Sequence, residues 1–195
     1  MSAICIIPAR GGSRRIKRKN IKDFLSHPII SYSILCAKAC SVFDRVVVTT
    51  DDAEIASVAE SYGADIYMRD MDFGDNSVGT QAVIKECLKG ISYRGQHVCC
   101  FYATAPLITS ADLSEGYQIL KQESHLHYVF TVGAEPLRDA GAWYWGKRMA
   151  FGSGKPLVGP HTRLYLLPNE RICDINTPKD WERAEQLYKE ANLVA

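Results

Sequence analysis

The sequence predicts an α/β domain in which a mostly parallel sheet lies between two layers of helices. Continuous apolar runs, such as residues 3–8, are typical of strands that are buried on both faces of a parallel sheet. Segments with apolar residues at helical spacing separate these runs, and this alternation implies right-handed crossovers with helices on both faces. The 195 residues are enough for one domain with a substantial core, so we expect a single domain over residues 1–195.

Local patterns predict each element in turn. Apolar or β-branched runs predict strands at residues 3–8, 45–50, 64–68, 97–102, 128–132, 143–145 and 163–167. Pro28 suits the first position of a helix that runs to about residue 40. Asp51 is expected to cap the next helix, with Glu54 as its capping-box partner and Gly63 at its end. Thr80 is expected to cap a third helix, and further helices are expected from about residues 110 and 177.

Composition excludes several classes of protein. Apolar residues make up 47% of the chain and charged residues 23%, which excludes a disordered protein. No apolar run approaches the ~20 residues of a membrane helix. The first residues also lack the regions of a signal peptide, so we expect a cytoplasmic protein that contacts no membrane. The seven cysteines form no Cys-x-x-Cys pair and are expected to be buried free thiols.

Positive charge is concentrated in one segment. The chain has 23 Lys and Arg against 22 Asp and Glu, a formal net charge of +1, yet seven cations and no acid lie between Arg10 and Lys22. This segment follows the first strand, and ligands of parallel α/β sheets bind beyond the carboxyl ends of the strands. Gly11 and Gly12 allow backbone N–H groups to approach a ligand, and Ser13 adds a donor, so the segment is typical of a phosphate site.

The same segment has two other interpretations. It matches neither the dinucleotide fingerprint nor the Walker A loop, so a solvated basic loop or a nucleic-acid patch is the alternative to a phosphate site. The near-zero net charge favours a local anion over a wide nucleic-acid surface.

Seven motifs lie along the chain in a fixed order. They are Ile7-Pro-Ala-Arg-Gly-Gly-Ser13, Arg18-Lys-Asn20, Pro28-Ile-Ile-Ser-Tyr-Ser33, Val48-Thr-Thr-Asp-Asp52, Tyr102-Ala-Thr-Ala-Pro106, Asp139-Ala-Gly-Ala-Trp-Tyr-Trp-Gly146 and Asp174-Ile-Asn-Thr-Pro-Lys-Asp-Trp181. Together they resemble the nonulosonate cytidylyltransferases, which are the CMP-sialic acid synthetases and their bacterial relatives, and the motifs at 102–106 and 139–146 resemble the pseudaminic acid branch. The resemblance implies a three-layer, Rossmann-like nucleotide-diphospho-sugar transferase fold. It also implies transfer of CMP from CTP to a nine-carbon acidic sugar, with release of pyrophosphate.

The resemblance implies roles for particular residues. Positions that match the family's CTP-binding residues are Ala9, Arg10, Gly11, Gly12, Ser13, Arg14, Lys19, Asn20, Arg69 and Thr80. The catalytic candidates are Arg10, Lys19 and Asp174. Tyr102 and Thr104 match positions that contact the sugar, and Tyr102 stands where sialic acid enzymes have Gln, which favours pseudaminic acid as the substrate.

A magnesium site is the remaining implication. In an extended Asp174-Ile-Asn176 segment the two polar side chains point the same way and can reach one Mg²⁺ ion. The family pattern is Asp-x-Asp, and the amide of Asn176 offers only a neutral oxygen, so Mg²⁺ affinity should fall. The other reading of Asn176 is part of the cap of the last helix. Asp51 and Asp52 are further acids that could join the ion.

A second departure concerns chain length. A stretch of a few dozen residues, which in relatives helps to form a dimer arm and part of the sugar pocket, is missing between Pro136 and Asp139. We therefore expect the dimer-arm insertion to be reduced or absent near residues 133–160, and the sequence leaves a homodimer open.

Three functions remain as hypotheses. The first is a Mg²⁺-dependent cytidylyltransferase for pseudaminic acid, with sialic or legionaminic acid as alternative substrates. The second is a CTP-binding homologue with impaired turnover, which Asn176 and the missing stretch motivate. The third is an RNA-binding module, which the neutral net charge and the lack of an aromatic recognition strand beside the basic loop disfavour.

Overall fold

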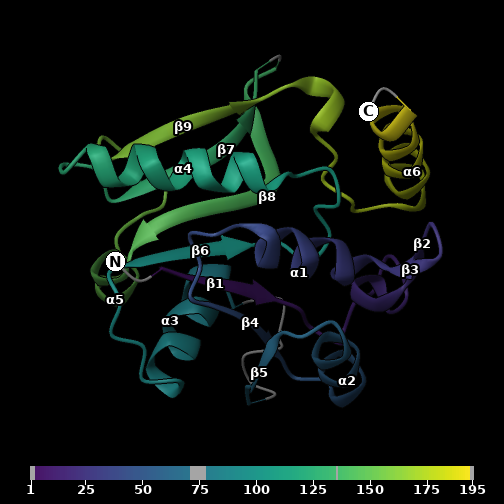
Figure 1. The fold of residues 1–195 in the computed structure, drawn as a ribbon, viewed down its shortest axis with the longest axis horizontal. Coiled ribbons are helices and arrows are strands. Elements are labelled where there is room, and N and C mark those ends of the chain that lie inside the picture. The colour runs from purple at the N-terminus through teal and green to yellow at the C-terminus, as the bar shows by residue number, and fades with distance from the viewer. Residues whose placement is uncertain (1–2, 71–77, 135, 194–195) are drawn as a thin grey trace.

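A seven-stranded sheet forms the centre of the computed structural model, which describes residues 3–70, 78–134 and 136–193. The strand order is β5-β4-β1-β6-β8-β7-β9 (Figure 1). The strands are β1 Ala3–Pro8, β4 Arg45–Thr50, β5 Asp65–Met68, β6 His97–Phe101, β7 Tyr128–Gly133, β8 Arg138–Lys147 and β9 Thr162–Leu167. All neighbouring strands run parallel except where β8 pairs with β6 and β7. The prediction of a mostly parallel α/β sheet is therefore confirmed.

Helices cover both faces of this sheet. They are α1 Ile29–Ala39, α2 Ala53–Ser61, α3 Thr80–Gly90, α4 Ser110–Gln122, α5 Arg148–Ser153 and α6 Pro178–Leu193. Successive side chains of β1 point to opposite faces of the sheet. Cys5 and Ile7 pack with α1, α2 and α4 on one face, whereas Ile4 and Ile6 pack with α3 and α5 on the other. This arrangement is the three-layer architecture that the sequence predicts.

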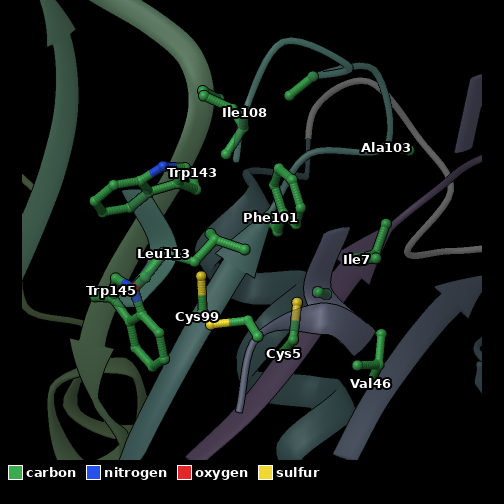
Figure 2. Close-up of a cluster of buried hydrophobic side chains, with 14 of the residues drawn as sticks. Cys5, Ile7, Val46, Cys99, Phe101, Ala103, Ile108, Leu113, Trp143 and Trp145 are labelled. Carbon is green, nitrogen blue, oxygen red and sulfur yellow. The ribbon is translucent and has the colours of Figure 1, made fainter. Parts of the chain in front are cut away.

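The larger core cluster is filled by aromatic side chains of β8 and thiols of β1 and β6. Figure 2 shows Trp143 and Trp145 beside Leu113, with Cys99 and Cys5 deeper in the same cluster. The indole N–H of Trp145 donates to the Leu113 carbonyl over 2.9 Å, which satisfies its polar atom inside the core. All seven cysteines are free, as the sequence predicts, but Cys36 and Cys173 are only half-buried, contrary to the expectation of buried thiols.

A third cluster fastens the C-terminal helix to the start of the chain. It joins Phe24 of the short hairpin β2 Asp23–Phe24 and β3 His27–Pro28 to Trp181 of α6, with Ile16 and Ile175 among its buried members. Figure 1 shows α6 beside this hairpin and the start of α1, where Ile29 and Tyr32 belong to the same cluster. The cluster therefore brings the segment before α6 next to the basic loop after β1, although the two are far apart in sequence.

Several boundaries differ from the sequence-based expectations. Asp52, not Asp51, caps α2, because its carboxylate accepts hydrogen bonds from the N–H groups of Glu54 and Ile55 at 3.0 Å. Gly79, not Thr80, is the cap position of α3. Helix α5, which is only six residues long, was not predicted. Within the described ranges, no helix is both long enough and apolar enough to cross a bilayer.

Candidate active site

The loop after β1 is held tightly against the start of α2. The N–H of Gly11 donates to Oδ1 of Asp51 over 2.9 Å, and a methyl group on Gly11 would collide with the carboxylate of Asp52. Only glycine permits so close an approach of backbone and carboxylate. Gly12 has open space around its Cα instead. The side-chain amide of Asn20 folds the loop back by donating to the Arg10 carbonyl over 2.9 Å.

Six of the seven cations of this loop divide into two groups, and Lys17, which is exposed, belongs to neither. Arg18 pairs with Asp52 and Glu54, and this hydrogen-bonded guanidinium lowers the pKa of Asp52. Lys22 lies 4.0 Å from the centre of the Trp181 ring. These two cations therefore stabilise the fold. Those that line a cavity instead are Arg10, Arg14, Arg15 and Lys19.

That cavity has a volume of about 310 Å³ and lies at the carboxyl ends of the strands. Its walls come from the loops after β1, β5 and β6, from the start of α3, and from the segment before α6. Sequence-predicted site residues among its lining are Arg10, Ser13, Arg14, Lys19, Asn20, Arg69, Thr80, Tyr102, Thr104 and Asn176. Ala9, Gly11, Gly12 and Asp174 lie beside the cavity in sequence but are not among its lining residues. The basic loop and the C-terminal segment thus share one cleft.

Arg69 marks one end of the cavity. Its side chain is only 3% exposed, and Nη1 donates to the Thr49 carbonyl over 2.8 Å while Nη2 lies 3.8 Å from Asp51. Burial lowers the pKa of Arg69, and the charge of Asp51 opposes this shift. Its Nε has no hydrogen-bond partner among the described residues. Arg69 therefore places a largely buried positive charge in the wall of the cavity.

Tyr102 lies on the wall that follows β6. Its backbone N–H donates to the Ala142 carbonyl over 2.9 Å, which fixes the loop to β8. Burial raises the pKa of its phenol, a hydrogen bond with Thr80 lowers it, and the negative charges of Asp139 and Asp174 raise it further. The phenol is therefore neutral, and it can donate a hydrogen bond but cannot act as an anion near neutral pH.

The segment before α6 carries the predicted metal residues. Nδ2 of Asn176 donates to Oδ2 of Asp174 over 2.5 Å, and Oδ1 of Asn176 accepts from Nη2 of Arg15 over 2.7 Å. The ammonium of Lys19 donates to the Ile175 carbonyl over 2.6 Å. Burial lowers the pKa of Lys19, which Asp174 partly offsets. Two hydrogen bonds through side chains thus join the loop to the segment, and a third orders the segment itself.

The side chain of Asn176 does not cap α6. Thr177 and Asp180 form that cap, since the Thr177 N–H donates to the Asp180 carboxylate over 2.7 Å and the Asp180 N–H donates to the Thr177 hydroxyl over 3.3 Å. The amide of Asn176 is therefore left for Asp174 and Arg15.

Sequence reasoning missed two residues of this region. Arg15 was recognised only as one of a run of cations, and nothing in its spacing distinguishes it. Asp139 accepts the Gly141 N–H over 2.7 Å, and the carboxylate of Asp174 packs against the same glycine, where a Cβ would lie 2.9 Å from its Cγ. Burial raises the pKa of Asp139, and the charge of Asp174 raises it further. The motif at 139–146 pointed to this region but assigned Asp139 no role.

A buried ion pair holds the approach to the C-terminal segment. Arg171 donates to Oδ2 of Asp112 over 2.6 Å, and the same carboxylate oxygen accepts from the Thr109 N–H over 2.9 Å. Asp112 is only 4% exposed. Asp174 follows Arg171 by only three positions in the sequence. The ion pair between Arg171 and Asp112 therefore restricts where the carboxylate of Asp174 can lie.

The connection between β7 and β8 is short. Gly133 pairs with Arg138 across the hairpin, so only residues 134–137 join the two strands. Of the described residues in this connection, 134, 136 and 137, none lines the cavity. The described part of this hairpin loop therefore contributes no wall to the cleft.

Similarity to known structures defines the class of fold. A CMP:2-keto-3-deoxy-manno-octonic acid synthetase, solved with CTP, superposes with a TM-score of 0.80 at 16% identity, covering 98% of this chain and 100% of that one. At this identity the likeness shows the fold alone, which is the α/β fold of a nucleotidyltransferase.

Sequence similarity then gives the family. Residues 4–142 match the family model described as Cytidylyltransferase. A pseudaminic acid cytidylyltransferase of Campylobacter jejuni is 36% identical over 225 aligned positions that cover 97% of each chain. An N-acylneuraminate cytidylyltransferase of Escherichia coli is 36% identical over 97% of this chain and 52% of its own length. The chain therefore belongs to the cytidylyltransferase family of enzymes. The first alignment is longer than the 195 residues of this chain, so part of that relative has no counterpart here.

Proposed function

We propose that this protein transfers CMP from CTP to the anomeric hydroxyl of a nine-carbon acidic sugar, pseudaminic acid, and releases pyrophosphate. The observation that carries the proposal is the convergence of seven of the ten predicted CTP residues, from two separate loops and the start of α3, on one cavity together with Asn176. Similarity to the pseudaminic acid cytidylyltransferase over nearly the full chain supports the choice of sugar.

The reaction requires the protein mainly to position the reactants and to offset negative charge on the phosphates. The sugar hydroxyl attacks the α-phosphorus in line, and the pyrophosphate departs with several negative charges. Arg10, Arg14 and Lys19 line the cavity and would offset this charge. Arg69 and Thr80 are proposed to hold the cytosine, and Ser13 and Asn20 the phosphates and ribose. Gly11 and Gly12 let the backbone beside Ala9 approach the nucleotide.

Mg²⁺ fits these residues as an ion that binds together with the nucleotide. Mg²⁺ usually takes one or two protein carboxylates and completes its octahedron with phosphate oxygens and waters. Asp174 is an exposed carboxylate near Lys19, whereas no cluster of three or more His, Cys, Asp and Glu lies within the described ranges. The ion would neutralise charge on the phosphates when bound. Asn176 can contribute its oxygen only if Arg15 releases it, and Asp51 and Asp52 are already engaged by Gly11 and Arg18.

Tyr102 and Thr104 are proposed to contact the acceptor sugar. Both line the cavity, on the wall that the loop after β6 forms. A neutral, buried phenol can donate to a sugar hydroxyl or acyl oxygen. The aromatic ring also gives the wall an apolar surface for the acyl and methyl groups of a deoxy sugar.

The experiment is an assay of pyrophosphate release from CTP and Mg²⁺ with pseudaminic, legionaminic and sialic acids. We expect release with pseudaminic acid and a CMP-sugar product detected by mass spectrometry. Release with only sialic or legionaminic acid would identify that sugar as the substrate instead. The proposed active site would remain the same cleft.

A CTP-binding homologue with impaired turnover is the second candidate. Two observations favour it: Asn176 stands where the family has an acid, and the hairpin connection at 134–137 supplies no described residue to the cleft. CTP binding by calorimetry without pyrophosphate release from any of the three sugars would establish this second function.

A further inference from the structure

Strand β8 bulges where it passes the segment before α6. Four residues of β8, 140–143, oppose only Thr131 of the neighbouring strand β7. The pairs that flank this bulge are Phe130–Tyr144 and Val132–Asp139. A bulge bends its strand and changes the direction in which the strand presents its residues, and bulges are frequent beside active sites. The sequence motif at 139–146 covers the bulge, and the proposed function so far uses none of its residues.

The hydroxyl of Thr131 closes the bulge on the side of β7. It donates to the Trp143 carbonyl over 2.7 Å and accepts from the Trp143 N–H over 3.2 Å. Thr131 is 0% exposed, so both hydrogen bonds lie inside the core. Buried backbone groups need partners, and here one side chain supplies both of them. Thr131 therefore fixes the shape of the bulge.

Two parts of the proposed active site rest on the backbone of the bulge. The Ala142 carbonyl accepts the N–H of Tyr102 over 2.9 Å, which holds the cavity wall after β6. Gly141, one residue earlier, has a φ of +60°, and its N–H donates to Asp139 over 2.7 Å. The carboxylate of Asp174 packs against this glycine, since a Cβ at position 141 would lie 2.9 Å from both its Cγ and its Oδ1. A side chain at this position would have to displace the carboxylate.

This contact supports one side of an exposed carboxylate. Oδ2 of Asp174 accepts the hydrogen bond from Asn176, whereas its Oδ1 lies over Gly141. Groups that lie outside the coordination sphere orient metal ligands, and their loss typically costs about 10- to 100-fold in metal affinity. Because glycine has no side chain, Asp174 can lie directly on the backbone of β8, next to the residue that holds Tyr102.

We propose that the bulge of β8 positions the metal carboxylate: Gly141 seats Asp174, and Thr131 keeps the bulge in shape. The proposal rests on the proposed function, in which Asp174 binds a divalent ion together with the nucleotide. It gives the motif at 139–146 a task, which is to hold this carboxylate and the backbone of the acceptor wall at a fixed separation. Gly141 and Thr131 are positioning residues, because neither lines the cavity.

The test measures metal binding without turnover. Mn²⁺ replaces Mg²⁺, and its affinity for the complex of protein and CTP is measured by electron paramagnetic resonance with no sugar present. In Gly141→Ala, we expect the dissociation constant for Mn²⁺ to rise about 10- to 100-fold, because the added methyl group displaces the carboxylate. Gly154→Ala is the matched control, since Gly154 also has a positive φ, +68°, but has open space around it. It carries the same backbone strain and should keep the Mn²⁺ affinity within about twofold of the parent.

A double variant separates the contact with Asp174 from damage elsewhere. Asp174→Ala removes the carboxylate that the methyl group at position 141 would meet, so adding Gly141→Ala should cause no further loss of Mn²⁺ affinity. In turnover assays, Gly141→Ala should raise the Mg²⁺ concentration for half-maximal rate, whereas KM for CTP at saturating Mg²⁺ should change less than about threefold. A further loss in the double variant, as large as the loss in the single variant, would show that Gly141 does not act through Asp174 and would overturn the proposal.

Thr131→Val tests the closure of the bulge. Valine keeps the shape of the side chain and removes the hydroxyl that pairs with Trp143. We expect Mn²⁺ binding to weaken by at least about threefold, and Thr131→Ser, which keeps the hydroxyl, to restore it. Equal Mn²⁺ affinity in Thr131→Val and the parent would overturn the role given to Thr131.

The outcomes separate this inference from the proposed function. Mn²⁺ binding that Gly141→Ala weakens, without pyrophosphate release from any acid sugar, would overturn the proposed function and leave the seat of Asp174 in place. Normal turnover with equal Mn²⁺ affinity in Gly141→Ala, Gly154→Ala and the parent would overturn the inference alone. Full Mn²⁺ affinity in Asp174→Ala would exclude Asp174 from the metal site and overturn the inference with it.

Discussion

Asp174 is proposed to act on the site through its charge. It is exposed, and its carboxylate accepts a hydrogen bond from the side chain of Asn176, so we expect the fold not to depend on it. We predict that Asp174→Ala lowers turnover at least about 100-fold, since an ion bound with the nucleotide would lose its protein carboxylate. The melting temperature should stay unchanged. Asp44→Ala, which removes an exposed acid elsewhere, is the control, and near-normal turnover in the Asp174 variant would exclude Asp174 from the metal site.

Lys19 makes the site sensitive to alkaline pH. Burial lowers its pKa, and the charges of Arg15 and Arg10 add to this effect against that of Asp174. A lysine is charged below its pKa, so this charge is lost as pH rises through the lowered value. We predict that kcat/KM for CTP falls on the alkaline side earlier than an ordinary lysine would allow. In Lys19→Arg this alkaline fall should vanish, because arginine stays charged, and an identical profile in the variant would contradict the assignment.

At the scale of elements, the joint between β1 and α2 depends on one glycine of the pair. A methyl group on Gly11 would collide with Asp52, which caps α2 and pairs with Arg18, whereas Gly12 has open space. We predict that Gly11→Ala lowers the free energy of unfolding by about 1–3 kcal/mol and weakens CTP binding. Gly12→Ala should leave the free energy of unfolding within about 1 kcal/mol of the parent. Urea denaturation of the two variants measures the difference, and equal losses would contradict it.

The elements themselves were predictable because their signals are local. The apolar run of β1 and the helical spacing of α3 each specify their structure within a dozen residues. The shift of the α2 cap from Asp51 to Asp52 could not be predicted, because the choice depends on Gly11, which lies 40 residues away and takes the Asp51 carboxylate. The contact between Arg15 and Asn176 spans 161 residues, and only the docking of α6 brings the two together.

For the molecule as a whole, the cleft joins two parts of the chain that lie far apart in sequence. The basic loop continues from the central sheet, whereas the segment with Asp174 and Asn176 is held by the cluster around Trp181 and by the Arg171–Asp112 pair. Ile16 belongs to that same cluster, so the loop and the C-terminal segment share one apolar anchor beneath the cavity. A ligand that contacts both sides should therefore couple the stability of the two parts.

Thermal unfolding measures this coupling. We predict that CTP with Mg²⁺, at about 100 times its dissociation constant, raises the melting temperature by roughly 5–10 °C, because binding to the folded state alone adds about 2.7 kcal/mol. ATP carries the same triphosphate on a larger base and should give a smaller rise at equal concentration. Asp174→Ala should reduce the part of the rise that depends on Mg²⁺ and leave the part that CTP alone provides. Stabilisation by single-stranded RNA, steeply weakened by salt and not reproduced by CTP, would instead assign the cationic loop to nucleic acid.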